Sequence, residues 1–155
     1  MYNNTGDDYA FVGLNIPISS ANIDGTGMML NERVKYAGKI GYVQISTANS
    51  LLNGSGTLGT LIIASANGYM IKRITIKARG TTTQGMIRLF YQEAATAFLY
   101  REVDVPAITQ SPRDETLIAV IDEPFYLKGN STLKVSTQKG EFFIVSVESV
   151  EMNYP

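Results

Sequence analysis

The chain of 155 residues contains no cysteine and no histidine. Without thiols it can form no disulfide, no thiolate nucleophile and no cysteine-based zinc site. Without imidazole it can form no Ser-His-Asp triad, no histidine-ligated zinc and no histidine general base. Any catalysis by this sequence would therefore depend on carboxylates, lysine or tyrosine.

Charge is also scarce, because only 17% of the residues are charged and the formal net charge is −1. Such a balance provides no overall field that would draw the chain to nucleic acid or to an anionic membrane. The longest apolar runs, Leu61 to Ala64 and Phe142 to Val145, are far too short to span a bilayer. Residues Met1 to Asp8 are acidic and lack the features of a signal peptide. We expect no membrane partner and no cofactor, and nucleic acid is not an expected partner.

Acidic residues occur as neighbours, at Asp114-Glu115 and Asp122-Glu123. Neighbours on a strand point to opposite faces, so such a pair cannot act together across a substrate cleft. No calcium-loop spacing accompanies them. We therefore predict that the protein is not an enzyme and holds no metal.

Alternation of apolar and polar residues is the clearest signal that the sequence carries. From Arg73 to Ala78 every second residue is apolar, and a similar alternation runs from Ile87 to Gln92. Period-two alternation in β-branched and aromatic residues predicts half-buried strands. The segment between them, Arg79 to Gly85, has a glycine near each end, so we predict a hairpin with a long loop at the centre of the chain.

Glycine marks several predicted turns and irregularities. Asn67-Gly68 is the strongest short hairpin signal and predicts that segment 57–65 pairs with segment 69–79. Gly38 and Gly41 interrupt the strand region 34–46 and predict a bulge or a bend there.

The segment between the first two predicted strands carries two further signals. Ala48 to Leu52 has the length of one helical turn. Gly54, Gly56 and Gly59 match the G-x-G-x-x-G spacing of dinucleotide sites, but a strand follows them where that site needs a helix. We interpret these glycines as a loop that leads into a strand.

Short strand-like segments recur along the rest of the chain, at 97–105, 115–121, 124–127, 132–137 and 141–152. About eight to ten short strands without a helical stripe predict an all-β domain. The mixture of tight hairpins and longer crossings favours a jelly-roll-like β-sandwich over an immunoglobulin-like one. We assign residues 31–155 to this domain and residues 1–30 to an extended N-terminal arm and loop.

Basic residues gather in the central third of the chain, at Lys72, Arg73, Lys77, Arg79, Arg88 and Arg101. Arg73 and Lys77 share a strand face with Thr75, which predicts a positive stripe beside Arg88. The stripe has three interpretations: a solvated sheet face, a surface that docks onto an acidic protein, or a nucleic-acid surface. The last ranks behind the others because net positive charge is missing.

Nine tyrosines are a second signal of contact, since tyrosine is favoured at protein interfaces. Those outside the clear strand cores are candidates either for contact or for ordinary packing: Tyr2, Tyr9, Tyr36, Tyr69 and Tyr154. The candidate interface predicted from the sequence consists of Tyr2, Tyr9, Phe11, Arg73, Lys77, Arg79 and Arg88.

The run from Ile71 to Phe90, IKRITIKARGTTTQGMIRLF, is followed by Tyr100-Arg101-Glu102 and then by Val103 to Pro106. This pattern resembles small virion structural proteins of tailed bacteriophages, over roughly Thr57 to Val150. The resemblance implies a capsid auxiliary or decoration protein that assembles in the bacterial cytoplasm and resides in the virion. It also implies other virion proteins as partners and a homo-oligomer such as a trimer. A carbohydrate- or host-recognition module of a head fibre or tail tip is the alternative.

Overall fold

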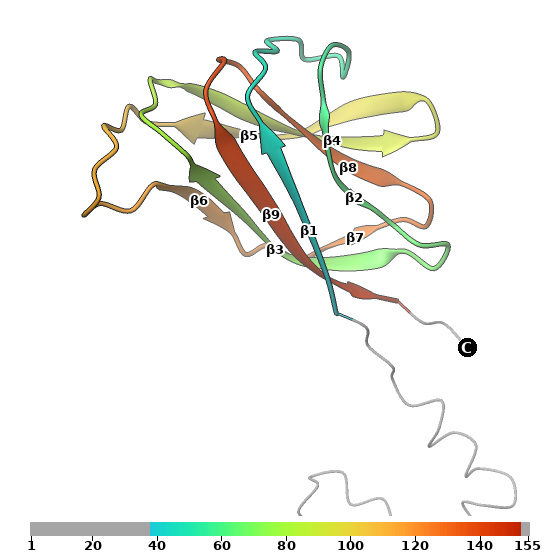
Figure 1. The fold of residues 1–155 in the computed structure, drawn as a ribbon. Helices are drawn as coiled ribbons and strands as arrows, with labels where there is room; N and C mark the ends of the chain where they lie inside the picture. Colours follow the sequence, from blue (N-terminus) through green and yellow to red (C-terminus); the bar gives the residue numbers. More distant parts are fainter. Residues whose placement is uncertain (1–37, 153–155) are drawn as a thin grey trace, which may run out of the picture. The chain divides into compact units, whose positions relative to one another are not determined.

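The structure is a computed structural model that describes residues 38–152, which form two antiparallel β-sheets packed as a sandwich (Figure 1). No helix occurs among these residues. The strands are β1 (Gly38–Ile45), β2 (Gly59–Ile63), β3 (Tyr69–Ala78), β4 (Gly85–Glu93), β5 (Thr96–Val105), β6 (Leu117–Ile121), β7 (Phe125–Leu127), β8 (Thr132–Thr137) and β9 (Phe143–Glu151). The predicted all-β sandwich is confirmed. The predicted arm, residues 1–30, lies outside the described residues.

The order of the strands is that of a jelly roll. Sheet A has the order β1-β9-β3-β6, and β7 pairs with the same edge of β3 as β6 does. Sheet B has the order β2-β8-β4-β5. When β6 and β7 are counted as one position, the eight positions alternate between the sheets except at the β4–β5 hairpin, which lies wholly in sheet B, and this is the order of two interlocked Greek keys. The jelly-roll-like prediction is therefore confirmed as well.

Both hairpins predicted at the centre of the chain are wrong. β2 lies in sheet B, β3 in sheet A and β4 in sheet B, so Asn67-Gly68 and Arg79 to Gln84 carry the chain from one sheet to the other (Figure 1). The turn itself is present, because Gly68 has a φ of +82° and its N–H donates to the carbonyl of Ser65. Alternation shows that a strand has one buried face, and strands of both sheets satisfy that condition.

One core fills the space between the sheets, and it is made of the apolar residues that alternate inward. In sheet A, β9 lies between β1 and β3, so both of its neighbours help to cover its inward side chains. Its inward residues Phe143, Val145 and Val147 are almost completely buried. Facing them from sheet B are residues such as Ile87 and Leu89 on β4. Each such side chain contributes about 1.5–3 kcal/mol by leaving water.

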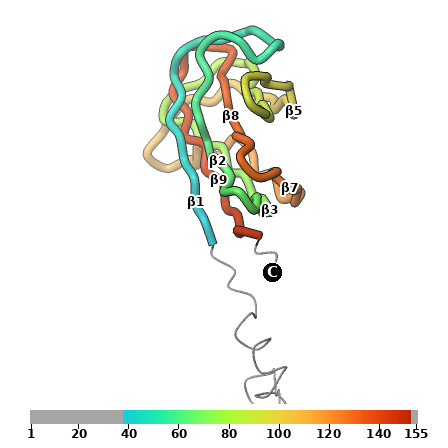
Figure 2. Tube along the Cα trace, turned by 90° about the vertical axis from the view of Figure 1, so that its right-hand side faces the viewer, coloured from blue at the N-terminus to red at the C-terminus, as the bar shows by residue number. Residues whose placement is uncertain are grey.

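The bulge predicted at Gly38 and Gly41 is absent, because β1 pairs with β9 without a shift in register. Gly41 has a different role. A Cβ at this position would lie 2.4 Å from the carbonyl oxygen of Leu61 and 3.0 Å from Cγ1 of Val147. β1 and β2 run side by side along this edge of the sandwich (Figures 1 and 2). Glycine permits that close approach.

Replacing Gly41 with alanine is expected to lower the free energy of unfolding by about 1–3 kcal/mol, because the added methyl group overpacks the contact with β2. The obstructing atom belongs to the backbone of Leu61, so no side-chain rotation relieves the contact. Gly38→Ala is the matched control, since a Cβ there meets nothing within 4 Å. Urea unfolding measures both variants, and equal midpoints would contradict this role of Gly41.

The segment between β1 and β2 forms no helical turn, so that prediction for Ala48 to Leu52 is wrong. Ala48 instead forms a parallel bridge with Thr137. Gly54 and Gly56 have φ values of +76° and +79°, and Gly59 begins β2. The three glycines thus belong to a loop that leads into a strand, as predicted.

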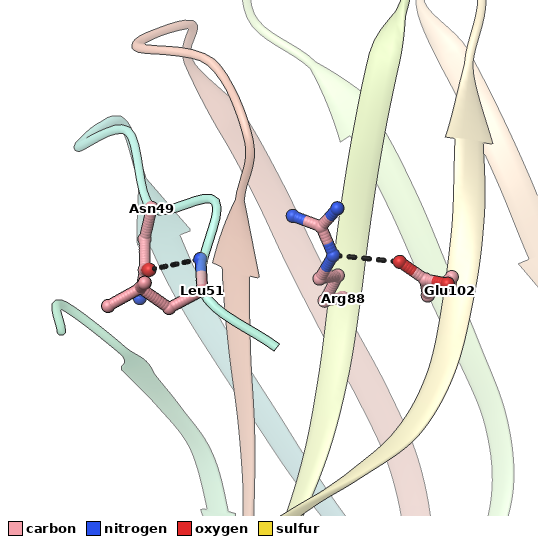
Figure 3. A network of polar contacts seen from close by, with 4 residues as sticks. All are labelled: Asn49, Leu51, Arg88 and Glu102. Carbon is pink, nitrogen blue, oxygen red and sulfur yellow. Dashed lines mark hydrogen bonds and ion pairs between the residues drawn. The ribbon is translucent and has the colours of Figure 1, made fainter. Parts of the chain in front are cut away.

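Asn49 explains why this segment curls back instead of continuing as a strand. Its buried Nδ2 donates to the carbonyls of Ser55 and Thr57, both at 2.9 Å. Its Oδ1 accepts a hydrogen bond from the N–H of Leu51 at 3.0 Å (Figure 3). One amide therefore satisfies three backbone groups that have no strand partner.

Candidate interaction surface

The outer face of sheet A is open to solvent across four strands, and we call it the open face. Strand register arranges it in three rows: Tyr42–Ser146–Thr75–Val120, Gln44–Ile144–Lys77–Leu117, and Ile40–Glu148–Arg73 with Asp122. The residues between them along each strand point inward to the core. The twist and pairing of the sheet therefore fix these side chains as one surface.

The open face carries the most exposed large apolar side chains of residues 38–152. Ile40 and Tyr42 on β1 are 74% and 77% exposed, and Val120 and Ile144 extend the apolar area towards β6. Single exposed apolar residues are ordinary, but a group on one rigid sheet favours contact with another protein. Tyrosine at such a position provides contact area at low cost in conformational entropy.

Charged groups on the open face are partly paired. Arg73 Nε donates to Asp122 Oδ1, and this hydrogen bond, together with the negative charges of Asp122 and Glu148, raises the pKa of Arg73. Arg79 follows β3, and its Nη1 donates to Gln44 Oε1 at 2.9 Å. Exposed pairs of this kind add little to stability, so their main effect is to orient the two guanidinium groups. The face is therefore mixed apolar and charged.

Three of the predicted basic residues, Arg73, Lys77 and Arg79, lie on or beside the open face. Arg88 does not, because it belongs to β4 in sheet B and is only 6% exposed. The predicted stripe that joins Arg88 to Arg73 is therefore wrong. It assumed that β3 and β4 are hairpin partners, and they belong to different sheets.

The predicted aromatic contacts have two outcomes. Tyr2, Tyr9 and Phe11 lie outside the described residues, as do Tyr36 and Tyr154. Tyr69 is buried in the core, so of its two alternatives ordinary packing is confirmed. Conversely, the interface predicted from the sequence omits Ile40 and Tyr42. The alternation along this strand indicates that both are exposed. Val43 and Ile45 point inward, so residues 40 and 42 point to the opposite face.

The outer face of sheet B is covered where it carries Arg88 and Phe90. Phe90 is completely buried although it alternates away from the core residues of β4. A Cβ on Gly54 would lie 2.6 Å from the Cβ of Ala97, so the loop between β1 and β2 lies against β5 on this side. This face is thus less accessible than the open face.

Arg88 forms a cross-strand ion pair beneath that cover. Its Nε donates to Glu102 Oε1 at 2.8 Å, and the two residues are register partners on β4 and β5 (Figure 3). The Arg88 side chain is buried, whereas that of Glu102 is 42% exposed. Nη1 of Arg88 is buried without a protein partner. The pair accounts for a charged residue inside the fold and leaves Arg88 unavailable for docking.

The acidic neighbours Asp122 and Glu123 do not converge on a common site. Asp122 binds Arg73, and Glu123 binds Arg101 at 3.0 Å. The hydrogen bond from Arg101 lowers the pKa of Glu123 and raises that of Arg101. Within residues 38–152 no cluster of three potential metal ligands occurs. The two carboxylates are therefore structural partners of arginines.

A shallow groove of about 570 Å³ lies between the β4–β5 turn and the β7–β8 turn. Phe98 and Asn130 line it, together with Glu93 and Lys128. The last two bind each other, and this hydrogen bond raises the pKa of Lys128. The groove lacks the combination of tyrosine with asparagine or aspartate that we take as favouring a sugar-recognition site.

In the part of the chain that the structure describes, no helix has the length and apolarity needed to cross a membrane.

Comparison with solved structures finds chains from two bacteriophage capsids. A chain from the acidic stable capsid structure of Helicobacter pylori bacteriophage KHP30 has a TM-score of 0.49 and 8% identity, covering 76% of this chain and 94% of that one. A chain from the capsid asymmetric unit of cyanophage Pam1 has a TM-score of 0.42 and 11% identity, covering 76% of this chain and 86% of that one. No family model and no curated protein sequence matches the chain. These identities and scores assign it to no family.

Proposed function

We propose that the protein is a bacteriophage virion structural protein, and specifically a capsid auxiliary or decoration subunit that acts by binding other virion proteins. The observation that carries this proposal is the open face, a rigid four-stranded surface with exposed Ile40 and Tyr42 beside oriented arginines. Such a surface suits protein association, and no cluster of three potential metal ligands occurs within residues 38–152.

The resemblance to small virion proteins involves the same surface. Its longest run, Ile71 to Phe90, covers most of β3, the crossing to sheet B and the first part of β4. Through β3 this run supplies Arg73, Thr75 and Lys77 to the open face. The residues that suggest a virion protein are thus partly the residues that would contact a neighbour.

A mass-spectrometric census of purified particles tests the proposal. Hundreds of copies per particle are expected for a protein that decorates the capsid, whereas about a dozen would indicate the neck or tail, where the alternative of a recognition module applies. Absence of the protein from the particle would contradict the virion assignment altogether.

Changing Ile144 to glutamate is expected to weaken attachment to the particle at least 30-fold, because it places a charge on an inner strand of the open face (a loss of about 2 kcal/mol or more). Ile63→Glu is the matched control, since Ile63 is also exposed but lies on β2 in sheet B. Binding of each purified variant to particles stripped of the protein gives the affinity. Equal binding by both variants would rule out the open face as the docking surface.

A further inference from the structure

The two sheets differ in how their edge strands are protected. Edge strands expose unpaired backbone N–H and C=O groups, and proteins blunt them with bulges, prolines or very short strands. Shifts in register occur where β2 pairs with β8, where β6 pairs with β3 and where β5 pairs with β4. β7 is only three residues long. Among the edges that the structure describes, β1 alone pairs over eight residues without a shift.

The side of β1 that faces away from β9 has a defined pattern of backbone groups. The carbonyl of Lys39 accepts a hydrogen bond from Ser149 Oγ at 3.0 Å, so the polar groups of Lys39 face β9. Because backbone direction alternates along a strand, those of Ile40, Tyr42 and Gln44 face the other edge, which pairs with no strand of residues 38–152 and which we call the free edge. The side chains of the same three residues lie on the open face.

The sequence of β1 provides no device against pairing. GKIGYVQI contains no proline and a single charged residue, Lys39. Its most exposed side chains, Ile40 and Tyr42, are two positions apart, with Gly41 between them. This arrangement is self-complementary, since two antiparallel copies centred on Gly41 place the isoleucine of each opposite the tyrosine of the other.

We propose that β1 pairs with β1 of a second copy, antiparallel and about a two-fold axis at Gly41, which joins two A sheets into one. This register uses the free backbone groups of Ile40 and Tyr42 and forms two cross-strand aliphatic–aromatic pairs. It sets Lys39 opposite Val43 of the second copy, so no like charges face each other. A two-fold axis at Tyr42 would also allow the backbone N–H and C=O groups to pair, but it would leave Ile40 opposite Gln44. The pairing is independent of the proposed virion function, because the isolated protein suffices to form it.

Engineered cysteines test the register, because the natural chain contains none. Full-length Ile40→Cys protein is mixed with ¹⁵N-labelled Tyr42→Cys protein and mildly oxidised, and the disulfides are identified by mass spectrometry. Hydrogen-bonded strand partners have Cα atoms about 5.5 Å apart, which suits a disulfide. We expect the mixed Ile40→Cys–Tyr42→Cys species to dominate. Dominant Tyr42→Cys homodimers would overturn the register, and linkage no greater than for an Ile63→Cys control would overturn the pairing.

Sedimentation equilibrium tests the assembly without cross-linking. The natural chain is expected at twice its monomer mass, and lysine at both Ile40 and Tyr42 is expected to weaken the dimer at least tenfold, because lysines guard an edge against pairing. Circular dichroism establishes that this variant is folded. Ile144→Glu is expected to remain dimeric even though it loses attachment to particles, which separates this inference from the proposed function. A trimer would require a head-to-tail contact and would contradict the two-fold pairing.

Discussion

Replacing Phe143 with alanine is expected to remove about 3–5 kcal/mol from the free energy of unfolding, because it leaves a cavity in the core beneath sheet A. Phe143 is 1% exposed and begins β9, where it lies opposite Ile45 of β1 and Ala78 of β3. Neighbouring strands on both sides fix the backbone, so the surroundings cannot collapse fully into the space. Since small domains are stable by only about 5–15 kcal/mol, the loss is a large fraction of the total.

Phe142 offers an unusually close control for this change. It is the preceding residue and the same amino acid, but it is 52% exposed. Phe142→Ala is expected to change the free energy of unfolding by no more than about 0.5 kcal/mol. Urea unfolding followed by fluorescence or circular dichroism gives both values. Similar losses at the two positions would mean that the inward side of β9 has been assigned wrongly.

Replacing Glu102 with alanine is expected to cost about 2–3 kcal/mol, because it leaves the buried Arg88 guanidinium without its counter-ion. The expected loss lies below the 3–5 kcal/mol typical of fully buried pairs, since Glu102 is partly exposed and water can replace some of its interaction. Nη1 of Arg88 already has no protein partner, and Glu102 is the guanidinium's one ion-pair partner among residues 38–152.

Two further variants separate charge from packing in this pair. Asp122→Ala breaks the exposed pair with Arg73 and is expected to cost less than about 1 kcal/mol. Adding Arg88→Met to Glu102→Ala removes the isolated charge and is expected to restore much of the lost stability. If the double variant is no more stable than Glu102→Ala alone, the loss comes from packing, and the ion pair does not have the assigned role.

The sequence predicts which segments of this fold form strands, but it does not predict which strands pair. The inward residues Ile74, Ile76, Ile87 and Leu89 follow the alternation that predicts them, and they are buried. The alternation contains no information on which sheet a strand joins, so the turn at Gly68 does not by itself distinguish a hairpin from a crossing between sheets. Partnership depends on pairings between distant segments, such as β1 with β9, which no local pattern encodes.

The candidate surface shows the same limit. Arg73 and Lys77 share a face because they are four residues apart along one strand, which is a local property. The predicted stripe reaches Arg88 only if β3 pairs with β4, and these strands belong to different sheets. The burial of Arg88 depends on Glu102 and on a loop that folds back against β5, and neither follows from the spacing of basic residues.

The central position of β9 determines when a newly made chain can fold. β9 is the last strand to leave the ribosome, yet β1 and β3 meet only through it. β8 holds the same place between β2 and β4, and β4–β5 is the one long hairpin that can form early. Folding that relies on such distant pairings is slow, on a scale of about milliseconds to seconds. Until β9 has emerged, β1 has two unsatisfied sides, so the growing chain exposes a strand that is prone to aggregate.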